Sequence, residues 1–439
     1  MFWTIVITVG VVAVAAISLA LVLLLSSSGG ERELSDLVEP EPIENDQFTR
    51  SLAGLLAPSF TSDNRVDLLV NGKEIFPAML AAIDDAKKTI TFETFIYWQG
   101  DIAAEFADAF CRAAARNVDV NVLLDWVGSR PMDRSLLKRM RKAGVRVVLY
   151  HPPRWSTLGR TNHRTHRKIL VVDGKVGFTG GVGIAQEWCG DGPKTGNIRD
   201  NHFRLAGPIV SQLQGAFMDN WLKSRQSVLH GEAYFPEISA GGQTGDDDQE
   251  DEPDAGHMRA MLFQSSPDQG SESLRLMFLF AIKSARESIR LSAAYFIPDD
   301  LMSQALIQAS SRGVRVQIIV PDETIDKAVV RYVSREYWRP LLDAGIDIRE
   351  YKGSMYHAKG IIIDDVFVSI GSGNFDNRSM HLNDEANLLV YDRQFARTMI
   401  DSFEDDLTNT EVQTIELWEK RPYWQRIYGR VARLIDSQL

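Results

Sequence analysis

The sequence predicts an α/β protein built from two similar lobes, each a mixed, mostly parallel sheet flanked by helices. We expect the lobes to pack as a pseudo-dimer behind an N-terminal transmembrane helix. Three observations predict this architecture: strand-like apolar runs alternate with helical patterns, the same order of elements occurs twice, and an uncharged apolar segment opens the chain. At 439 residues the chain is long enough for two or three domains, and its 44% hydrophobic content is ordinary for globular proteins.

The N-terminal segment 2–25 contains no charged residue and exceeds the roughly 20 apolar residues that a membrane-spanning helix needs. A cleaved secretory signal is the rival interpretation, but it expects a basic start, and the first basic residue is Arg32. We therefore expect a transmembrane anchor at 2–25, followed by a polar, acidic linker at 26–60. Neither flank carries the excess of Lys and Arg that sets membrane orientation.

The remaining chain divides at a second polar segment, 239–257, which is rich in Gly and acidic residues and cannot bury a core. We assign 61–238 to the first lobe and 258–439 to the second. In the first lobe the helical pattern FPAMLAAIDDAKKTI precedes the strand-like TFETFIYW, and in the second LRLMFLFAIKSARESI precedes RLSAAYFIP. Similar elements in the same order indicate an internal duplication.

One motif, His-x-Lys-x-x-x-x-Asp, occurs once in each lobe, inside the apolar runs HRKILVVD and HAKGIIID. The copies comprise His166, Lys168 and Asp173, and His357, Lys359 and Asp364. On a strand, alternation places the His and the Lys of each copy on one face. A lysine offers positive charge to a phosphate oxygen, one histidine can attack phosphorus, and the other can protonate the leaving alkoxide. One histidine must be neutral and the other protonated, which explains why the motif occurs twice. This chemistry calls for no metal or cofactor.

A single histidine on an apolar strand is more often a structural group than a catalyst, but two matches at equivalent places make coincidence a poor explanation. Asp173 and Asp364 stay in the candidate catalytic set as motif members, although their position at Asp-Gly and Asp-Asp favours closing a turn. His163 and His166 form a His-x-x-His pair, but no acidic or Cys residue stands at ligand spacing, so we do not predict a metal site.

Net charge and cysteine usage argue against a nucleic-acid-binding protein, a disulfide-rich protein and a zinc protein. The formal net charge of −11 disfavours a broad nucleic-acid surface, which needs clustered Lys and Arg. Cys111 lies in an apolar helical pattern and is interpreted as a small buried hydrophobe. Cys111 and Cys189 form neither a disulfide framework nor a zinc-type spacing.

The two motifs resemble the HKD signature of the phospholipase D superfamily, and the wider match is to bacterial cardiolipin synthases. The resembling segments include LLVNGKEIFPAML, FIYWQGD, NHRTHRKILVVDGKVGFTGG, RDNHFRLAGP, HAKGIIID and GSGNFDNRSMHLNDEANLLVYD, within about residues 65–425. The resemblance implies two lobes around one active site, a phosphohistidine intermediate, and transfer of a phosphatidyl group between two phosphatidylglycerol molecules with release of glycerol. It also implies a single-pass protein of the bacterial inner membrane with cytoplasmic lobes and an anionic phospholipid substrate.

Carried over position by position, the resemblance assigns roles to the two His-Lys pairs. His166 resembles the usual nucleophile and His357 the general acid and base, an order that follows family habit and not the residues themselves. Lys168 and Lys359 correspond to the phosphate-binding lysines.

Four further residues become candidates for substrate binding through the same resemblance. Ser372 and Asn374 match the family's Gly-Ser-x-Asn, and Glu385, 28 residues after the second-lobe histidine, matches the acid that holds a catalytic imidazole. Asp200, 34 residues after the first-lobe histidine, is a looser match and is expected to serve the first lobe. The first lobe departs from the pattern because Gly183 stands at the position of the Asn, which makes the two halves unequal.

Two apolar segments leave alternatives open. The C-terminal LWEKRPYWQRIYGRVARLI could lie at a lipid headgroup surface or form a helix docked on the second lobe, and we favour docking. The run LMFLFAI at 276–282 could face lipid, but a core helix is the better interpretation.

Three other functions stay open beside cardiolipin synthesis. A hydrolytic phospholipase D would use the same residues with water as acceptor. A membrane-anchored nuclease is disfavoured by the acidic balance, and no nucleic-acid partner is expected. A non-enzymatic lipid-binding scaffold is disfavoured because both His-Lys pairs are intact. The sequence does not determine the oligomeric state.

Overall fold

The computed structural model describes residues 40–153, 162–225, 227–237, 257–266 and 272–434. The predicted anchor at 2–25 and nearly all of the acidic linker at 239–257 lie outside these residues. Among the helices that are described, none combines the length and the apolar character needed to cross a bilayer.

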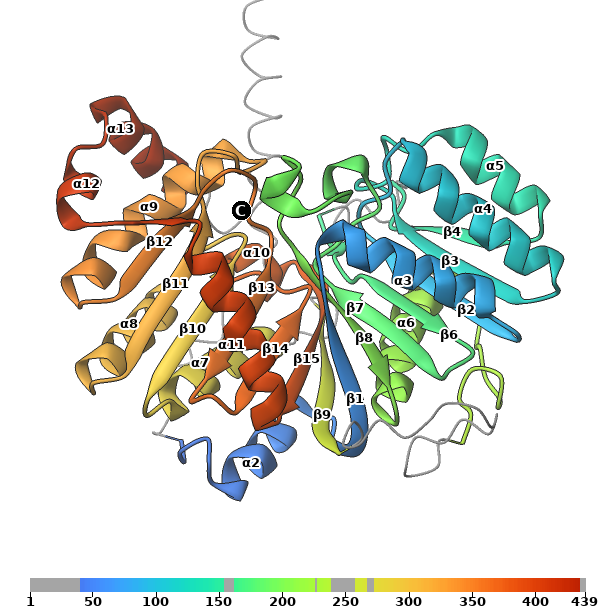
Figure 1. Ribbon diagram of the computed structural model, residues 1–439, viewed down its shortest axis with the longest axis horizontal. Coiled ribbons are helices and arrows are strands. Elements are labelled where there is room, and N and C mark those ends of the chain that lie inside the picture. Colours follow the sequence, from blue (N-terminus) through green and yellow to red (C-terminus); the bar gives the residue numbers. More distant parts are fainter. Residues whose placement is uncertain (1–39, 154–161, 226, 238–256, 267–271, 435–439) are drawn as a thin grey trace, which may run out of the picture.

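The first half alternates strands and helices before it turns into hairpins (Figure 1). Its elements are β1 (Thr61–Val70), α3 (Asn71–Asp85), β2 (Thr89–Thr94), α4 (Asp101–Ala115), β3 (Asp119–Asp125), α5 (Arg134–Lys142), β4 (Arg146–Tyr150), β5 (Arg164–Thr165), β6 (Ile169–Val172), β7 (Val176–Gly180), β8 (Asn201–Ala206) and α6 (Ile209–Arg225).

The second half repeats this order and adds a C-terminal extension of one strand and two helices. Its elements are β9 (Met258–Ser265), α7 (Ser273–Ser284), β10 (Ser288–Ala293), α8 (Asp300–Ser311), β11 (Arg315–Pro321), α9 (Ala328–Asp343), β12 (Asp347–Tyr351), β13 (Lys359–Ile363), β14 (Phe367–Gly371), α10 (Asn377–His381), β15 (Asn383–Tyr391), α11 (Arg393–Leu407), β16 (Thr410–Val412), α12 (Ile415–Glu419) and α13 (Tyr423–Ala432).

Strand order confirms the predicted α/β class and the duplication. The first half reads β8-β7-β6-β2-β3-β4, and the second reads β15-β14-β13-β10-β11-β12. Equivalent strands also pair in the same register. Ile90 of β2 pairs with Val172 of β6, and Ile289 of β10 pairs with Ile363 of β13. Antiparallel pairing of β1 with β9 joins the halves into one continuous sheet.

The prediction of a mostly parallel sheet is wrong. Only β2-β3-β4, β10-β11-β12 and the short β5–β15 contact are parallel, and the other pairings among the described strands are antiparallel. The motif runs form hairpins, β6–β7 and β13–β14, and a tight turn can join only antiparallel strands. Their near-continuous apolar character, which suggested parallel strands, follows instead from helices on both faces (Figure 1).

Helices cover both faces of each half because their apolar residues recur at helical spacing. In α4 the buried side chains include Ile102, Phe106 and Phe110, which pack with α3, α5 and one face of the first-half strands. The predicted core helix at 276–282 is confirmed, since α7 buries every residue from Met277 to Ile282.

The predicted linker at 26–60 is wrong for residues 46–56, which form the helix α2 (Asp46–Leu56). Phe48 stacks on Phe280 of α7 at 5.3 Å between ring centroids and meets Phe367 edge-on at 5.2 Å. Leu52 joins the same core, so this segment belongs to the second half although it precedes the first in sequence. Its acidic and polar surface residues masked an amphipathic helix.

Candidate active site

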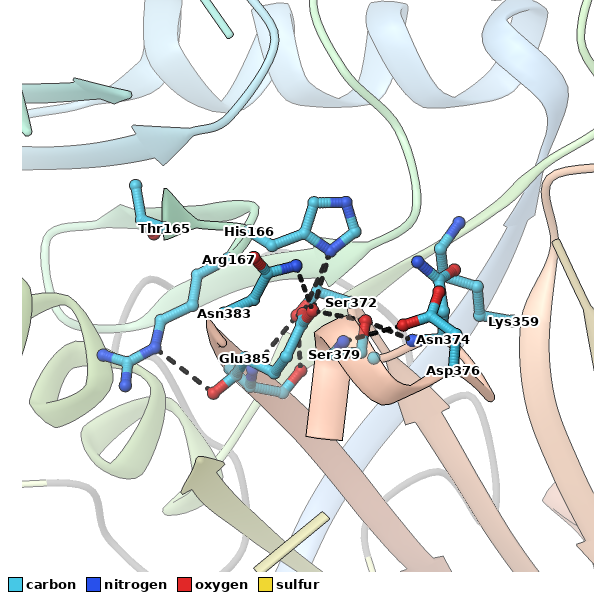
Figure 2. Close-up of polar contacts among 12 residues, drawn as sticks. Thr165, His166, Arg167, Lys359, Ser372, Asn374, Asp376, Ser379, Asn383 and Glu385 are labelled. Carbon is cyan, nitrogen blue, oxygen red and sulfur yellow. Dashed lines mark hydrogen bonds and ion pairs between the residues drawn. The ribbon is translucent and has the colours of Figure 1, made fainter. Parts of the chain in front are cut away.

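Glu385 of β15 holds the first-half histidine. The Nδ1 atom of His166 lies 3.0 Å and 3.1 Å from the two carboxylate oxygens of Glu385, so it donates its hydrogen there and directs Nε2 away from the carboxylate. The carboxylate is braced in turn, because Ser372, Ser379 and Asn383 all donate to it (Figure 2).

Asp200, which directly precedes β8, holds the second-half histidine. The Nδ1 atom of His357 lies 2.6 Å from Asp200 Oδ2. The same oxygen accepts a hydrogen bond from the indole of Trp188 at 2.9 Å, and the Trp188 ring meets the imidazole edge-on. Both histidines therefore have a buried carboxylate on Nδ1 and an aromatic neighbour, Phe95 in the case of His166.

The prediction that Asp200 serves the first lobe is wrong, because the carboxylates are exchanged between the halves. Main-chain bonds explain the exchange: His166 donates its N–H to the carbonyl of Asp384, and His357 donates to the carbonyl of Arg199. Each histidine thus docks beside the residue that precedes the other half's acid. Neither half holds a complete histidine–carboxylate pair alone.

The main-chain hydrogen bonds show that Asp200 and Glu385 occupy equivalent positions in the two halves, although different residues surround their carboxylates. The N–H of Gly181 bonds the residue after Asp200, and the N–H of Ser372 bonds the residue after Glu385. A β-carbon on Gly181 would stand 2.2 Å from Asp200 Oδ1. The first half therefore has a glycine where the second half has the serine that braces its acid.

Ser372 and Asn374 both lie at the site, but the hydroxyl of Ser372 is not free to bind phosphate. The hydroxyl of Ser372 donates to Glu385 and accepts from the N–H of Ala386 at 3.0 Å, so its hydrogen is committed to the carboxylate. Asn374 is buried beside Lys359, and its Oδ1 has no partner (Figure 2). In the first half a β-carbon on Gly183 would meet Ile96 at 2.7 Å, which leaves no room for the family asparagine.

The two motif lysines occupy equivalent buried places. Lys168 Nζ donates to the carbonyl of His166 at 2.7 Å, and Lys359 Nζ donates to that of His357 at 2.8 Å. Lys359 also lies 2.9 Å from His357 Nδ1. Each ammonium group is thereby fixed against the main chain of the histidine that precedes it by two residues.

The motif aspartates lie at the opposite end of their strands from the histidines. Asp173 accepts from the N–H groups of residues 87, 88 and 89, and Asp364 accepts from those of residues 286, 287 and 288. The strand between Lys168 and Asp173 separates them by about 16 Å at ~3.3 Å per residue. Their inclusion in the catalytic set is not supported by this geometry, which matches the turn-closing alternative.

Sequence reasoning missed Ser379, Asn383 and Trp188, which brace the two acids. Ser379 and Asn383 lie within the quoted GSGNFDNRSMHLNDEANLLVYD segment, but small polar residues there carry no signal of their own. Trp188 lies in a short 3₁₀ turn between β7 and β8, 12 residues from Asp200, and only the fold brings the two together.

The family model described as "Cardiolipin synthase, PLD-like domain" matches residues 79–189 and 278–407, one block in each half. The chain is also 33% identical over 383 residues to the major cardiolipin synthase of Bacillus subtilis (strain 168), covering 87% of this chain and 76% of that protein. The chain belongs to the cardiolipin synthase family of phospholipase D-like proteins.

Other members of the cardiolipin synthase family show comparable similarity. A cardiolipin synthase of Staphylococcus aureus (strain N315) is 30% identical over 386 residues, covering 87% of this chain and 75% of that protein.

The crystal structure of phosphatidylserine synthase from Haemophilus influenzae Rd KW20 aligns with a TM-score of 0.68 over 89% of this chain and all of that one. At 16% identity this likeness shows a shared fold.

Burial and charge set unequal proton affinities in this cardiolipin synthase family site. Burial, reinforced by Lys168, holds the pKa of His166 well below its usual range, and burial raises the pKa of Glu385 to about 7. Burial also lowers the pKa of His357, while Asp200 opposes that shift. Burial works to raise the pKa of Asp200, but His357, Lys359 and Trp188 together outweigh it and the net shift is downward. The second-half histidine therefore has the more firmly ionised partner.

Proposed function

We propose that this protein is a phosphatidyltransferase that makes cardiolipin from two phosphatidylglycerol molecules. The observation that carries the proposal is the exchanged pair of histidine–carboxylate contacts, His166 with Glu385 and His357 with Asp200, in a chain of the cardiolipin synthase family. Two imidazoles with Nδ1 held by carboxylates suit a reaction that needs one nucleophile and one acid.

In the first step, Nε2 of neutral His166 attacks the phosphorus of phosphatidylglycerol. The bond from phosphorus to the headgroup glycerol oxygen breaks, and His357 in its protonated form gives that oxygen a proton. Glycerol leaves, and a phosphatidyl-histidine remains. The low pKa of His166 supports its role as the nucleophile, and the ionised Asp200 supports holding a proton on His357.

In the second step, a headgroup hydroxyl of another phosphatidylglycerol enters where glycerol left. His357, now neutral, removes the hydroxyl proton, and the oxygen attacks phosphorus as the bond to His166 breaks. Cardiolipin leaves, and both histidines return to their starting protonation. Lys168 and Lys359 would balance the negative charge on the phosphate oxygens in both steps.

We further propose that the reaction takes place at the bacterial inner membrane, on the cytoplasmic side, with the segment 2–25 as a single-pass anchor. The support is the uncharged sequence of that segment and the phospholipid substrate that the family relationship suggests.

Product analysis tests the proposal. The full chain in vesicles of phosphatidylglycerol should produce cardiolipin and glycerol in equal amounts, with no divalent cation added. Release of phosphatidic acid as the main product would identify a hydrolase and overturn the transferase. His166→Ala is the matched control and should yield neither product.

A further inference from the structure

The C-terminal helix α13 has an exposed apolar side that no described part of the chain covers. Its exposed residues include Tyr423 at 77%, Val431 at 61% and, just beyond the helix, Leu434 at 84% exposure. Trp424, Ile427 and Tyr428 extend the same side. On a helical projection these six residues occupy one arc of about 140° at ~100° per residue, so they form a continuous surface. A contiguous apolar surface of this kind marks an interaction site.

The opposite side of α13 is firmly docked on α9, so the exposed side is held in a fixed direction (Figure 1). The docked side carries the buried residues Gly429 and Ala432. Trp424 and Tyr428, at the border of the exposed arc, meet Tyr332 of α9 edge-on at 5.6 Å and 5.4 Å, and Arg421, just before the helix, pairs with Glu336 at 3.1 Å. A β-carbon on Gly429 would stand 2.8 Å from the carbonyl oxygen of Tyr332, so glycine permits the close approach. The predicted docking on the second lobe is confirmed.

Charge distinguishes this surface from the rest of the chain. The segment 420–434 contains five Lys or Arg residues and no Asp or Glu, whereas the whole chain has a net charge of −11. Arg430 is exposed, and Arg426 and Arg433 follow the same border of the apolar arc. Basic residues along an apolar helical face match an anionic phospholipid surface, with acyl and glycerol groups against the apolar side and headgroup phosphates against the arginines.

The helix also adjoins the wall of the active site. Ala432 of α13 packs in one apolar cluster with Met355, Ile297 and Ile325, with Ile198 at its margin. Met355 lies two residues before His357, and Ile198 lies two residues before Asp200.

We propose that the exposed side of α13, defined by Tyr423, Trp424, Ile427, Tyr428, Val431 and Leu434, inserts into the headgroup region of an anionic bilayer. The helix thereby holds the active-site entrance against the leaflet that supplies the phospholipid. This surface goes beyond the predicted anchor, because it sets the direction in which the site faces the membrane. The inference rests on the proposed phospholipid substrate.

The test places an environment-sensitive fluorophore on the full chain reconstituted in vesicles. The probe is attached at Ile427→Cys, in a background with Cys111→Ala and Cys189→Ala. The matched control is Phe235→Cys, an exposed apolar position beside the Asp173 turn at the opposite edge of the sheet. In vesicles containing phosphatidylglycerol, the Ile427 probe should be quenched by a nitroxide placed at headgroup depth, and the Phe235 probe should not.

Three outcomes would overturn the proposal. The Ile427 probe could stay open to an aqueous quencher in phosphatidylglycerol vesicles, or both probes could be quenched equally. Protection that needs no anionic lipid and grows with protein concentration would instead place a second copy of the chain on α13. Quenching does not depend on turnover, so a lipid-bound but inactive protein would count against the proposed function alone.

Activity gives a second readout. Ile427→Asp combined with Val431→Asp should lower turnover of phosphatidylglycerol in vesicles several-fold and leave turnover of dispersed short-chain phosphatidylglycerol unchanged. Arg430→Gln should weaken vesicle binding by at most about fivefold. Val412→Asp, an exposed apolar position on β16, is the matched control and should change neither activity. Equal losses on vesicles and dispersed substrate would contradict a membrane-docking role.

Discussion

The two halves keep the same frame around their histidines but brace the partner carboxylates differently. In the first half Asp200 is bound by Trp188 and has the space left by Gly181. In the second half Glu385, one methylene longer, is bound by three polar side chains, including Ser372. The difference teaches that the two halves share the histidine–carboxylate geometry while the residues that support each carboxylate differ.

Exchange of the acids across the halves has a further consequence. Because each histidine is oriented by the other half, the site is lost if the halves separate, and a change in one half's acid acts on the other half's histidine. Variants of equivalent positions are therefore the sharpest probes of the comparison.

The largest expected contrast is between the histidines. His166→Ala should abolish both turnover and the covalent intermediate, because it removes the nucleophile. His357→Ala should lower turnover of phosphatidylglycerol by about 10²–10⁴-fold. It should retain release of p-nitrophenol from phosphatidyl-p-nitrophenol, whose leaving group needs no proton. Acid quenching with a labelled phosphatidyl group measures the intermediate, and an intermediate in His166→Ala alone would reverse the two roles.

The acids should differ next. Asp200→Asn should lower kcat by about 10³–10⁴-fold, since an amide cannot stabilise the imidazolium form of His357. Glu385→Gln should have a smaller effect, because the raised pKa of Glu385 leaves it less charged to begin with. Steady-state kinetics with phosphatidylglycerol compares them, and a larger loss for Glu385→Gln would contradict the proposed asymmetry.

Exchanging Gly181 and Ser372 tests how the residues beside each carboxylate hold it in place. Gly181→Ser must displace Asp200, because its β-carbon would meet the carboxylate, and we expect a loss of about 10²-fold in kcat. Ser372→Gly removes one of several donors to Glu385 and should cost less. The measurement is kcat at equal folded fraction, and a silent Gly181→Ser would show that Asp200 tolerates displacement.

The lysines should give a pH dependence that differs between the halves. Burial lowers the pKa of Lys168 to about 7 and that of Lys359 to about 8. In the proposed mechanism both lysines bind phosphate only when protonated, so kcat/KM should fall as pH rises from about 7 to 9. Lys168→Arg stays charged and should move the start of this fall upward, whereas Lys359→Arg should leave it near 7. Identical pH profiles for the two variants would contradict the difference.

The smallest effect on catalysis is expected at the motif aspartates, where the halves match. Asp173→Ala and Asp364→Ala each remove the acceptor of three main-chain N–H groups and should lower the free energy of unfolding by about 3 kcal/mol. Denaturant unfolding measures this loss, and kcat per folded molecule should be unchanged. A collapse of kcat with normal stability would return these residues to the catalytic set.

Much of the fold followed from local sequence signals. Apolar periodicity and the repeated motif predicted an α/β duplication, and strand alternation placed each His and Lys together. The hairpins were misjudged because a buried antiparallel strand and a buried parallel strand have the same apolar pattern. The helix α2 was missed because its contacts, with Phe280 and Phe367, lie more than 200 residues away.

The sequence by itself determined that two His-Lys pairs exist and that they occupy equivalent places in two similar halves. The family resemblance added Glu385 as a candidate partner for an imidazole. Only the tertiary structure decided which acid meets which histidine. Spacing along the chain favours a partner in the same half, but pairing of β1 with β9 and the bonds from each histidine to the strand opposite place the other half's acid closer. Hydrogen-bond partners are chosen by proximity in space, and that proximity is set by how the two halves join.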